Sequence, residues 1–259
     1  MSNLIYLKVD TTGTDISKDR IVLISALKIS EYGRTKFHRY VKPDGKWSIS
    51  SDATAVNGIT DEYIRENGED PKSTLVEFNN FLNAEKGNDL VTFNGMNFDI
   101  RILAIEAEHY GVKLDLEFHR MFDLYEIESR NNPNDFTSTY LRHVGLDKDT
   151  VDGNAPKKTV ESVERLFWKM SSDYTREQMI GNFNPTILDT QNMYRMDDKG
   201  NLVFVRGKHY GETVYDTIQK DPEYIMFLFK NIISEHSKRI IINDYEKRKK
   251  MVETEPVSR

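Results

Sequence analysis

The side chains best suited to chemistry in this sequence are charged residues at the ends of short apolar runs. The run from Leu4 to Val9 is followed by Asp10 and then by Thr11-Thr12-Gly13, a combination typical of a strand that ends in a turn. Lys8 precedes Asp10 by two residues, and strand side chains alternate with period two, so both lie on one face. Carboxylate oxygens bind hard divalent cations, and a nearby ammonium group neutralises them. These charges therefore decide which chemistry is open to the chain.

The surrounding pattern predicts the elements that position these residues. Three apolar stretches at the N-terminus indicate strands, and later strands alternate with amphipathic helices. This order favours an α/β layer fold with a mixed central sheet flanked by helices. The expected strands span 4–10, 21–29, 36–41 and 89–93, with a hairpin turn at 31–34, and the expected helices span 73–82, 98–110, 138–143 and 159–170.

Composition excludes several classes of protein. The chain has 259 residues, a formal net charge of −6 and 38% hydrophobic residues, which suffices for a packed core and rules out wholesale disorder. The absence of cysteine excludes a disulfide scaffold, a thiolate metal site and a cysteine nucleophile. The N-terminus is unlike a signal peptide, and no apolar run reaches the roughly 18 residues of a membrane span. We expect a cytoplasmic protein with no membrane association. The amino-acid composition, rich in Lys, Asn and Ile, is compatible with a bacterial or phage origin.

Five motifs, in order, resemble those of the DnaQ-like DEDDh 3′–5′ exonucleases over about residues 3–170. Asp10-Thr11-Thr12-Gly13 resembles the first motif, and Asn94 to Asp99 lies in a segment similar to the second, "HNxxFD". Residues 55–60 resemble the "xVxGIT" loop, and Asp123 resembles the strand-end aspartate before the third helix. Residues 152–158 occupy the place of the third motif, "HxAxxD". The resemblance implies an RNase H-like exonuclease fold.

The resemblance also implies a chemistry. Such enzymes hydrolyse phosphodiesters from a 3′ end with two divalent metal ions about 4 Å apart. Four carboxylates hold these ions, and a histidine acts as general base for the attacking water.

This sequence departs from the catalytic pattern at three of five positions. The first-motif aspartate falls on Lys8, the general base on Gly153 and the last aspartate on Lys158, whereas Asp10 and Asp99 keep carboxylates. Two lysines and two aspartates sum to zero charge, so the site no longer attracts two divalent cations. Loss of the base alone lowers the rate about 10²–10⁴-fold. We therefore predict a catalytically degenerate site that holds no metal ion; Asp10 and Asp99 are the only ligands expected if one is held.

Other interpretations of these positions remain open. Asp10 could take the first aspartate place and Thr12 the glutamate place if the register differs by two. A substitute ligand could come from Asp15, Asp19 or Asp152. The lysines could form internal salt bridges with Asp10 and Asp99 that merely hold an obsolete cleft together. Alternatively, Lys8 and Lys158 could grip a phosphate without metal.

The C-terminal part resembles a small "GKHKGK…DPxY" module that some bacterial DnaQ-like exonucleases carry. Residues 205–214 and Asp221-Pro222 match it, although Glu212 replaces a lysine. We expect an exonuclease domain at 1–180, a connector at 181–205, a small helical module at 206–250 and a flexible tail at 251–259. The residues that the resemblance suggests for nucleic-acid binding are Thr11, Thr12, Gly13, Asn94, Lys208 and His209.

Three functions follow as hypotheses. The first is a pseudo-exonuclease that binds nucleic acid, DNA in preference to RNA, or a protein partner. The second is a weak 3′–5′ exonuclease with a remodelled site and Mg²⁺ or Mn²⁺ as cofactor. The third is a structural or assembly protein that reuses the fold.

Overall fold

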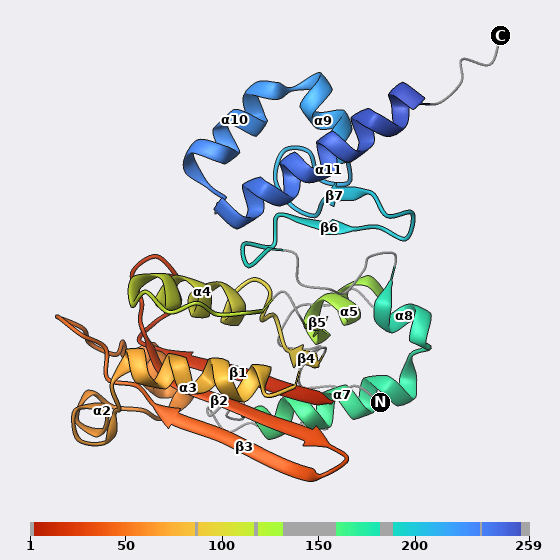
Figure 1. Cartoon of the computed structure of the whole chain (residues 1–259). Coiled ribbons are helices and arrows are strands. Elements are labelled where there is room, and N and C mark those ends of the chain that lie inside the picture. Colours follow the sequence, from red (N-terminus) through yellow and green to blue (C-terminus); the bar gives the residue numbers. More distant parts are fainter. Residues whose placement is uncertain are drawn as a thin grey trace. The chain divides into compact units, whose positions relative to one another are not determined.

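The computed structural model describes residues 3–85, 88–116, 119–131, 159–181, 189–233 and 235–254. The chain divides into two compact units, Met1–Gly181 and Asn182–Arg259 (Figure 1). Each unit has its own buried core. In the described part of the chain, no helix combines the length and the apolar character that a membrane crossing requires.

A five-stranded mixed sheet forms the centre of the N-terminal unit. Its strand order is β3-β2-β1-β4-β5. The first three strands pair antiparallel, whereas β4 and β5 continue parallel to β1. The mixed sheet predicted from the sequence is therefore confirmed. The strands are β1 (Leu4–Thr11), β2 (Ile21–Ser30), β3 (Gly33–Tyr40), β4 (Asp89–Thr92) and β5 (Arg120–Asp123).

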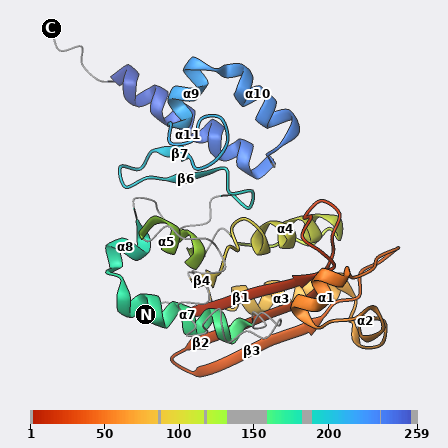
Figure 2. The same cartoon turned by 180° about the vertical axis from the view of Figure 1, so that it is seen from behind.

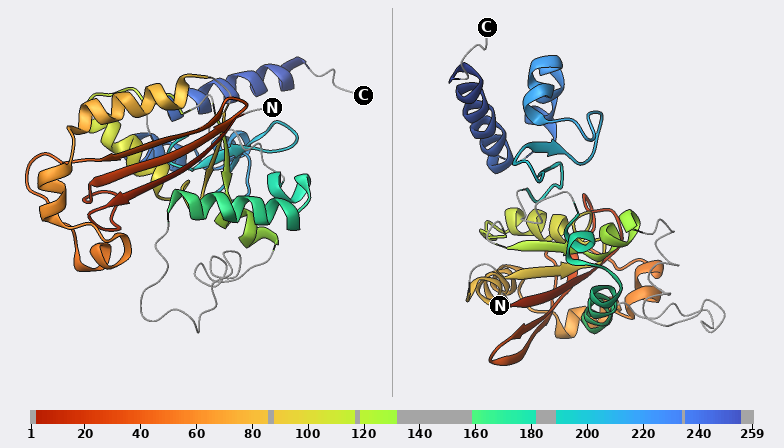
Figure 3. Two further views of the ribbon diagram at one scale, coloured as in Figure 1. Left: turned by 90° about the horizontal axis from the view of Figure 1, so that it is seen from below. Right: turned by 90° about the vertical axis from the view of Figure 1, so that its right-hand side faces the viewer.

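Helices cover both faces of this sheet. On one face α3 (Pro71–Asn83) and α4 (Asp99–His109) pack, and on the other α7 (Val160–Asp173) packs against β1, β2 and β4 (Figure 3). The apolar side of α7, which includes Val163 and Phe167, meets Tyr6 of β1 in a shared core. Figure 2 shows α7 in front of the sheet together with the short helix α1 (Ser51–Asn57). The other helices among the described residues of this unit are α2 (Asp61–Asn67), α5 (Leu124–Asn131) and α8 (Arg176–Ile180).

Local sequence signals explain where the long helices begin. Asp70 caps α3 by accepting a hydrogen bond from the amide of Ser73, and Pro71 occupies the first turn. Thr159 and Ser162 form a reciprocal capping box at the start of α7. Both helices lie within two residues of their predicted starts. The helix expected at 138–143 lies outside the described residues, and α1 and α2 were not predicted.

In the described part of the C-terminal unit, three helices pack around a common core with a β-hairpin. Its core contains Tyr194, Phe204, Leu228 and Ile241, all nearly inaccessible to solvent. The hairpin lies within residues 189–205, so this part of the expected connector belongs to the folded unit. The last helix runs to Thr254, so the first residues of the expected flexible tail are helical as well. The elements are β6 (Tyr194–Met196), β7 (Leu202–Phe204), α9 (Val214–Lys220), α10 (Pro222–Asn231) and α11 (Glu235–Thr254).

Candidate active-site cleft

A cleft of about 520 Å³ opens at the C-terminal end of β1. Its walls come from four parts of the N-terminal unit: the end of β1 with the following loop, helix α1, the β4–α4 turn and α7. Six residues singled out from the sequence line it together, namely Lys8, Asp10, Thr11, Gly13, Asn94 and Asp99. The fold thus brings the first and second motifs into one site, although they lie about 85 residues apart in the chain.

Lys8 and Asp10 form an ion pair within this cleft. The Lys8 ammonium group contacts the Asp10 carboxylate and also donates to the carbonyl oxygen of Val9 at 3.2 Å. Their side chains are only 15% and 14% exposed, so water screens the pair poorly. The salt bridge therefore neutralises the carboxylate to which the resemblance to DnaQ-like exonucleases assigns metal binding. For this pair the contact is the internal salt bridge that was one of the open interpretations.

Asp99 is the most deeply buried carboxylate of the cleft. It is 7% exposed, and its Oδ1 accepts a hydrogen bond from the backbone amide of Val9 at 2.7 Å. That amide needs a partner because the parallel β1–β4 ladder ends at Tyr6. Burial raises the pKa of Asp99 to about 6, although the Lys8 ammonium group opposes this change. The carboxyl group therefore keeps its proton up to a higher pH than an exposed aspartate does.

By themselves, the cleft side chains that the structure describes do not fit a pair of divalent cations, because the Lys8 ammonium group occupies the place beside Asp10. Within the described residues, no three acidic or imidazole groups converge at a point that could hold a metal ion. Asp15 and Asp19 do not line this cleft: Asp15 accepts hydrogen bonds from Ser17, and Asp19 accepts them from Thr12 and the amide of Asp15. The third-motif positions Asp152, Gly153 and Lys158 lie outside the described residues.

The β4–α4 turn is held by a carboxylate behind the cleft. Asp123, at the end of β5, accepts hydrogen bonds from the amides of Asn94 at 2.8 Å and Met96 at 3.0 Å. Asn94 adopts a left-handed conformation with φ of 62°. A side chain at Gly95 would come within 2.4 Å of Thr92, so only glycine fits there. Asp123 thus positions Asn94 on the cleft wall rather than lining the cleft itself.

The three residues after Asp10 have different roles. Thr11 and Gly13 line the cleft, whereas the Thr12 side chain is buried within the loop. The Thr12 hydroxyl donates to Asp19 at 2.8 Å and accepts from the amide of Arg20 at 3.0 Å. A Cβ atom at Gly13 would lie 2.5 Å from the Asp19 carboxylate. The Thr-Thr-Gly sequence therefore builds the loop, and its proposed contacts with nucleic acid stay a prediction.

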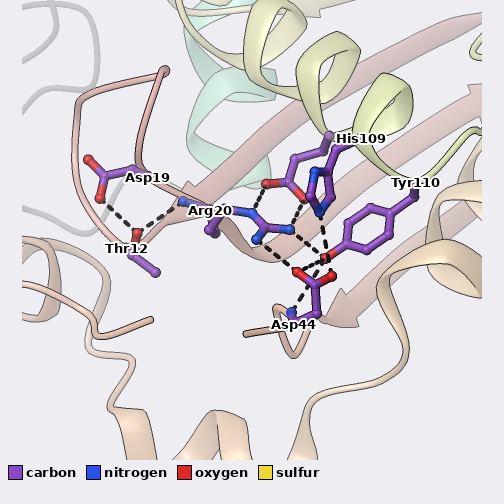
Figure 4. A network of polar contacts seen from close by, with 7 residues as sticks. Thr12, Asp19, Arg20, Asp44, His109 and Tyr110 are labelled. Carbon is purple, nitrogen blue, oxygen red and sulfur yellow. Dashed lines mark hydrogen bonds and ion pairs between the residues drawn. The ribbon is translucent and has the colours of Figure 1, made fainter. Parts of the chain in front are cut away.

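Arg20 connects this loop to helix α4 and to the segment before α1 (Figure 4). Its guanidinium group forms a bidentate pair with Glu106 of α4, at 2.6 and 3.2 Å, and bonds Asp44 at 2.9 Å. It also donates to the Tyr110 hydroxyl, which in turn donates to Asp44 at 3.0 Å. The network ties the β1–β2 loop, α4 and the segment before α1 together. No sequence signal pointed to it, because its members are far apart and belong to no motif.

We expect Arg20→Met to lower the free energy of unfolding by about 2–3 kcal/mol, because it leaves the Glu106 carboxylate buried without its partner. Urea unfolding of the full chain measures this loss. The double variant Arg20→Met/Glu106→Gln removes the stranded charge and should recover most of the stability. If the double variant is less stable than the single one, the network is not held together in this way.

In the C-terminal unit, Lys208 and His209 are engaged by one carboxylate. Asp221 pairs with the Lys208 ammonium group at 2.6 Å and with His209 Nε2 at 3.0 Å, and it also caps α10. The hydrogen bond from Lys208 holds the pKa of Asp221 at about 2, well below its usual value. The His209 ring additionally packs against Tyr224. Both residues stabilise their loop, and a role in nucleic-acid binding stays a prediction.

Comparison with known proteins relates the N-terminal unit to nucleases. A family model described as exonuclease, RNase_T, matches residues 9–150. A PolC-type DNA polymerase III from Thermotoga petrophila is 32% identical over 106 residues, which are 40% of this chain and 7% of that protein. Escherichia coli exonuclease I in its zinc-bound complex with single-stranded DNA superposes with a TM-score of 0.55 at 16% identity, over 69% of this chain and 42% of the other. Its product-bound form gives a TM-score of 0.53 at 15% identity, over 66% of this chain and 44% of the other. The chain thus spans less than half of each of these proteins, and the two structures share the fold.

Proposed function

The chain belongs to the exonuclease family, and we propose that within this family it is a pseudo-exonuclease, which holds single-stranded DNA in the cleft at the end of β1 without hydrolysing it. One observation carries the proposal. The Lys8 ammonium group forms an ion pair with the Asp10 carboxylate and so takes the place that a metal cation would need beside this side chain.

The lining of the cleft suits a nucleotide. Phe93, Phe98 and Val56 provide apolar surface for a sugar or a base, and Asn94 and Asn57 provide amide groups. The E. coli exonuclease I structures hold single-stranded oligonucleotides. Because this chain shares their fold, we extend the ligand class to it as part of the proposal.

Two other functions are candidates for this chain. Asp10 and Asp99 both line the cleft, which favours a weak 3′–5′ exonuclease in which these two carboxylates would hold Mg²⁺ or Mn²⁺. A structural or assembly role with a protein partner is the other candidate, and it requires no ligand in the cleft.

A charge placed in the cleft tests the proposal. Val56 is 54% exposed and lines the cleft, so Val56→Glu should repel a phosphate backbone there. We expect about tenfold weaker binding of single-stranded DNA in EDTA, which corresponds to about 1.4 kcal/mol, as measured by fluorescence anisotropy.

Val76→Glu is the matched control for this variant. Val76 is 44% exposed and lies on α3, outside the cleft. Its substitution adds the same negative charge to the chain and should leave binding unchanged. Equal losses in both variants, or none in Val56→Glu, would refute binding in the cleft.

A further inference from the structure

Two rows of side chains lead from the cleft across the sheet. Asp10 lies opposite Leu23, which lies opposite Tyr40, and Lys8 lies in the same way opposite Ser25 and His38. Directly opposed residues of antiparallel strands point to the same face of a sheet. Tyr40 and His38, on the edge strand β3, therefore share the face that carries the Lys8–Asp10 pair.

Aromatic rings gather where these rows end. The His38 and Tyr40 rings are 5.3 Å apart, and the Tyr40 and Tyr63 rings are 4.8 Å apart in an edge-to-face arrangement. Nearby on the chain, the Arg65 guanidinium group lies over the Trp47 ring at 5.8 Å. We call this set of four rings, His38, Tyr40, Trp47 and Tyr63, the aromatic edge.

The aromatic edge is continuous with the cleft. Tyr40, Trp47 and Ala53 all pack against the same buried cluster, which contains Leu23 and Ile64. Ala53 belongs to α1 and lines the cleft as well. Thus one hydrophobic cluster packs against both a wall of the cleft and two rings of the aromatic edge.

The outer ring of this set is ready to stack. Tyr63 is 42% exposed, and its edge-to-face contact with Tyr40 fixes the ring in place. An aromatic ring held in advance loses little conformational freedom when a nucleobase stacks on it. Stacking accepts any base, which suits a ligand that is bound without regard to sequence.

We propose that single-stranded DNA whose end lies in the cleft continues over the aromatic edge, with one of its bases stacked on Tyr63. This proposal rests on the proposed function, since it starts from a strand held at the Lys8–Asp10 pair. It adds the direction in which the strand leaves the site and the residue that contacts it.

The test compares a trinucleotide, which fills only the cleft, with a dodecanucleotide, which also reaches the aromatic edge. Tyr63→Ala should weaken binding of the dodecanucleotide about five- to tenfold and leave that of the trinucleotide unchanged. Tyr63→Trp, which keeps a stacking surface, should retain the wild-type affinity. Thermal unfolding of each variant shows that the fold is intact.

Tyr32→Ala is the matched control. Tyr32 is 86% exposed and lies in the β2–β3 turn, at the opposite end of β3 from Tyr40. Its removal deletes an exposed tyrosine beside the same edge strand and should not change binding of either oligonucleotide.

Fluorescence gives an independent readout. The sequence contains two tryptophans, so Trp168→Phe leaves Trp47 as the only indole. The dodecanucleotide should quench this emission, and the trinucleotide should not. Equal binding of the dodecanucleotide by wild type and Tyr63→Ala would overturn the path over the aromatic edge while leaving the cleft proposal standing. Failure of both oligonucleotides to bind would overturn the proposed function, and this inference with it.

Discussion

Replacing Lys8 by aspartate is expected to convert the cleft into a divalent-metal site. Three carboxylates would then stand where an ammonium group and two carboxylates now lie, because residues 8 and 10 share one face of β1 and Asp99 faces them. In EDTA the variant should be about 3 kcal/mol less stable than the wild type, since a poorly solvated pair has become a repulsive cluster. Mn²⁺ at about one hundred times its Kd should restore about 2.7 kcal/mol.

Calorimetry and thermal unfolding with and without Mn²⁺ measure both effects. Lys8→Met is the control, because it removes the ammonium group without adding a ligand and should lose stability that Mn²⁺ does not restore. The expectation is wrong if the wild type binds Mn²⁺ as tightly as the Lys8→Asp variant does.

The second large effect concerns Asp99, whose substitution by asparagine should stabilise the protein near neutral pH. Burial raises the pKa of this carboxyl group from 3.8 to about 6. Between these values the folded state holds a proton that the unfolded state has released, so the free energy of unfolding falls as the pH rises from about 4 to about 6. Asparagine keeps an oxygen for the Val9 amide and carries no charge. We expect a gain of about 1–3 kcal/mol at about pH 7.5 and little change at about pH 4.

Denaturant unfolding at the two pH values checks this expectation. Asp10→Asn serves as the contrasting variant. It removes the carboxylate that pairs with Lys8 and should destabilise the protein by about 1 kcal/mol at neutral pH. If Asp99→Asn proved destabilising at about pH 7.5, the ionised carboxylate would be favourable in the fold, and burial would not dominate its energetics.

Much of the N-terminal unit could be predicted from the sequence because its strands carry a local signal. The apolar runs before Asp10 and before Asn94 are buried on both sides, and such runs are read directly as β1 and β4. Gly13 after the first run and Asn94-Gly95 after the second mark turns, and Asn94 has the left-handed conformation typical of a turn. The motif order then implied that Asp10 and Asp99 meet, and both line one cleft.

The rest depends on contacts between distant parts of the chain, which leave no local pattern. Arg20 finds Glu106 and Asp44 only once α4 and the segment before α1 have packed, so the sequence shows three unrelated charged residues. The hairpin of the C-terminal unit was missed because β6 and β7 have three residues each, too few to show alternation. Lys208 and His209 were grouped as ligand contacts because nothing local reveals that Asp221 engages both.

The most direct test of the central claim is a digestion measurement on the purified full chain. A single-stranded DNA labelled at its 5′ end is incubated with the protein in Mn²⁺, and binding and length of the DNA are followed in the same samples. We expect the DNA to be bound by the cleft, and the Lys8–Asp10 ion pair predicts that it stays at full length. Shortening from the 3′ end that disappears in the Asp10→Ala variant would contradict this account and identify the protein as an active exonuclease.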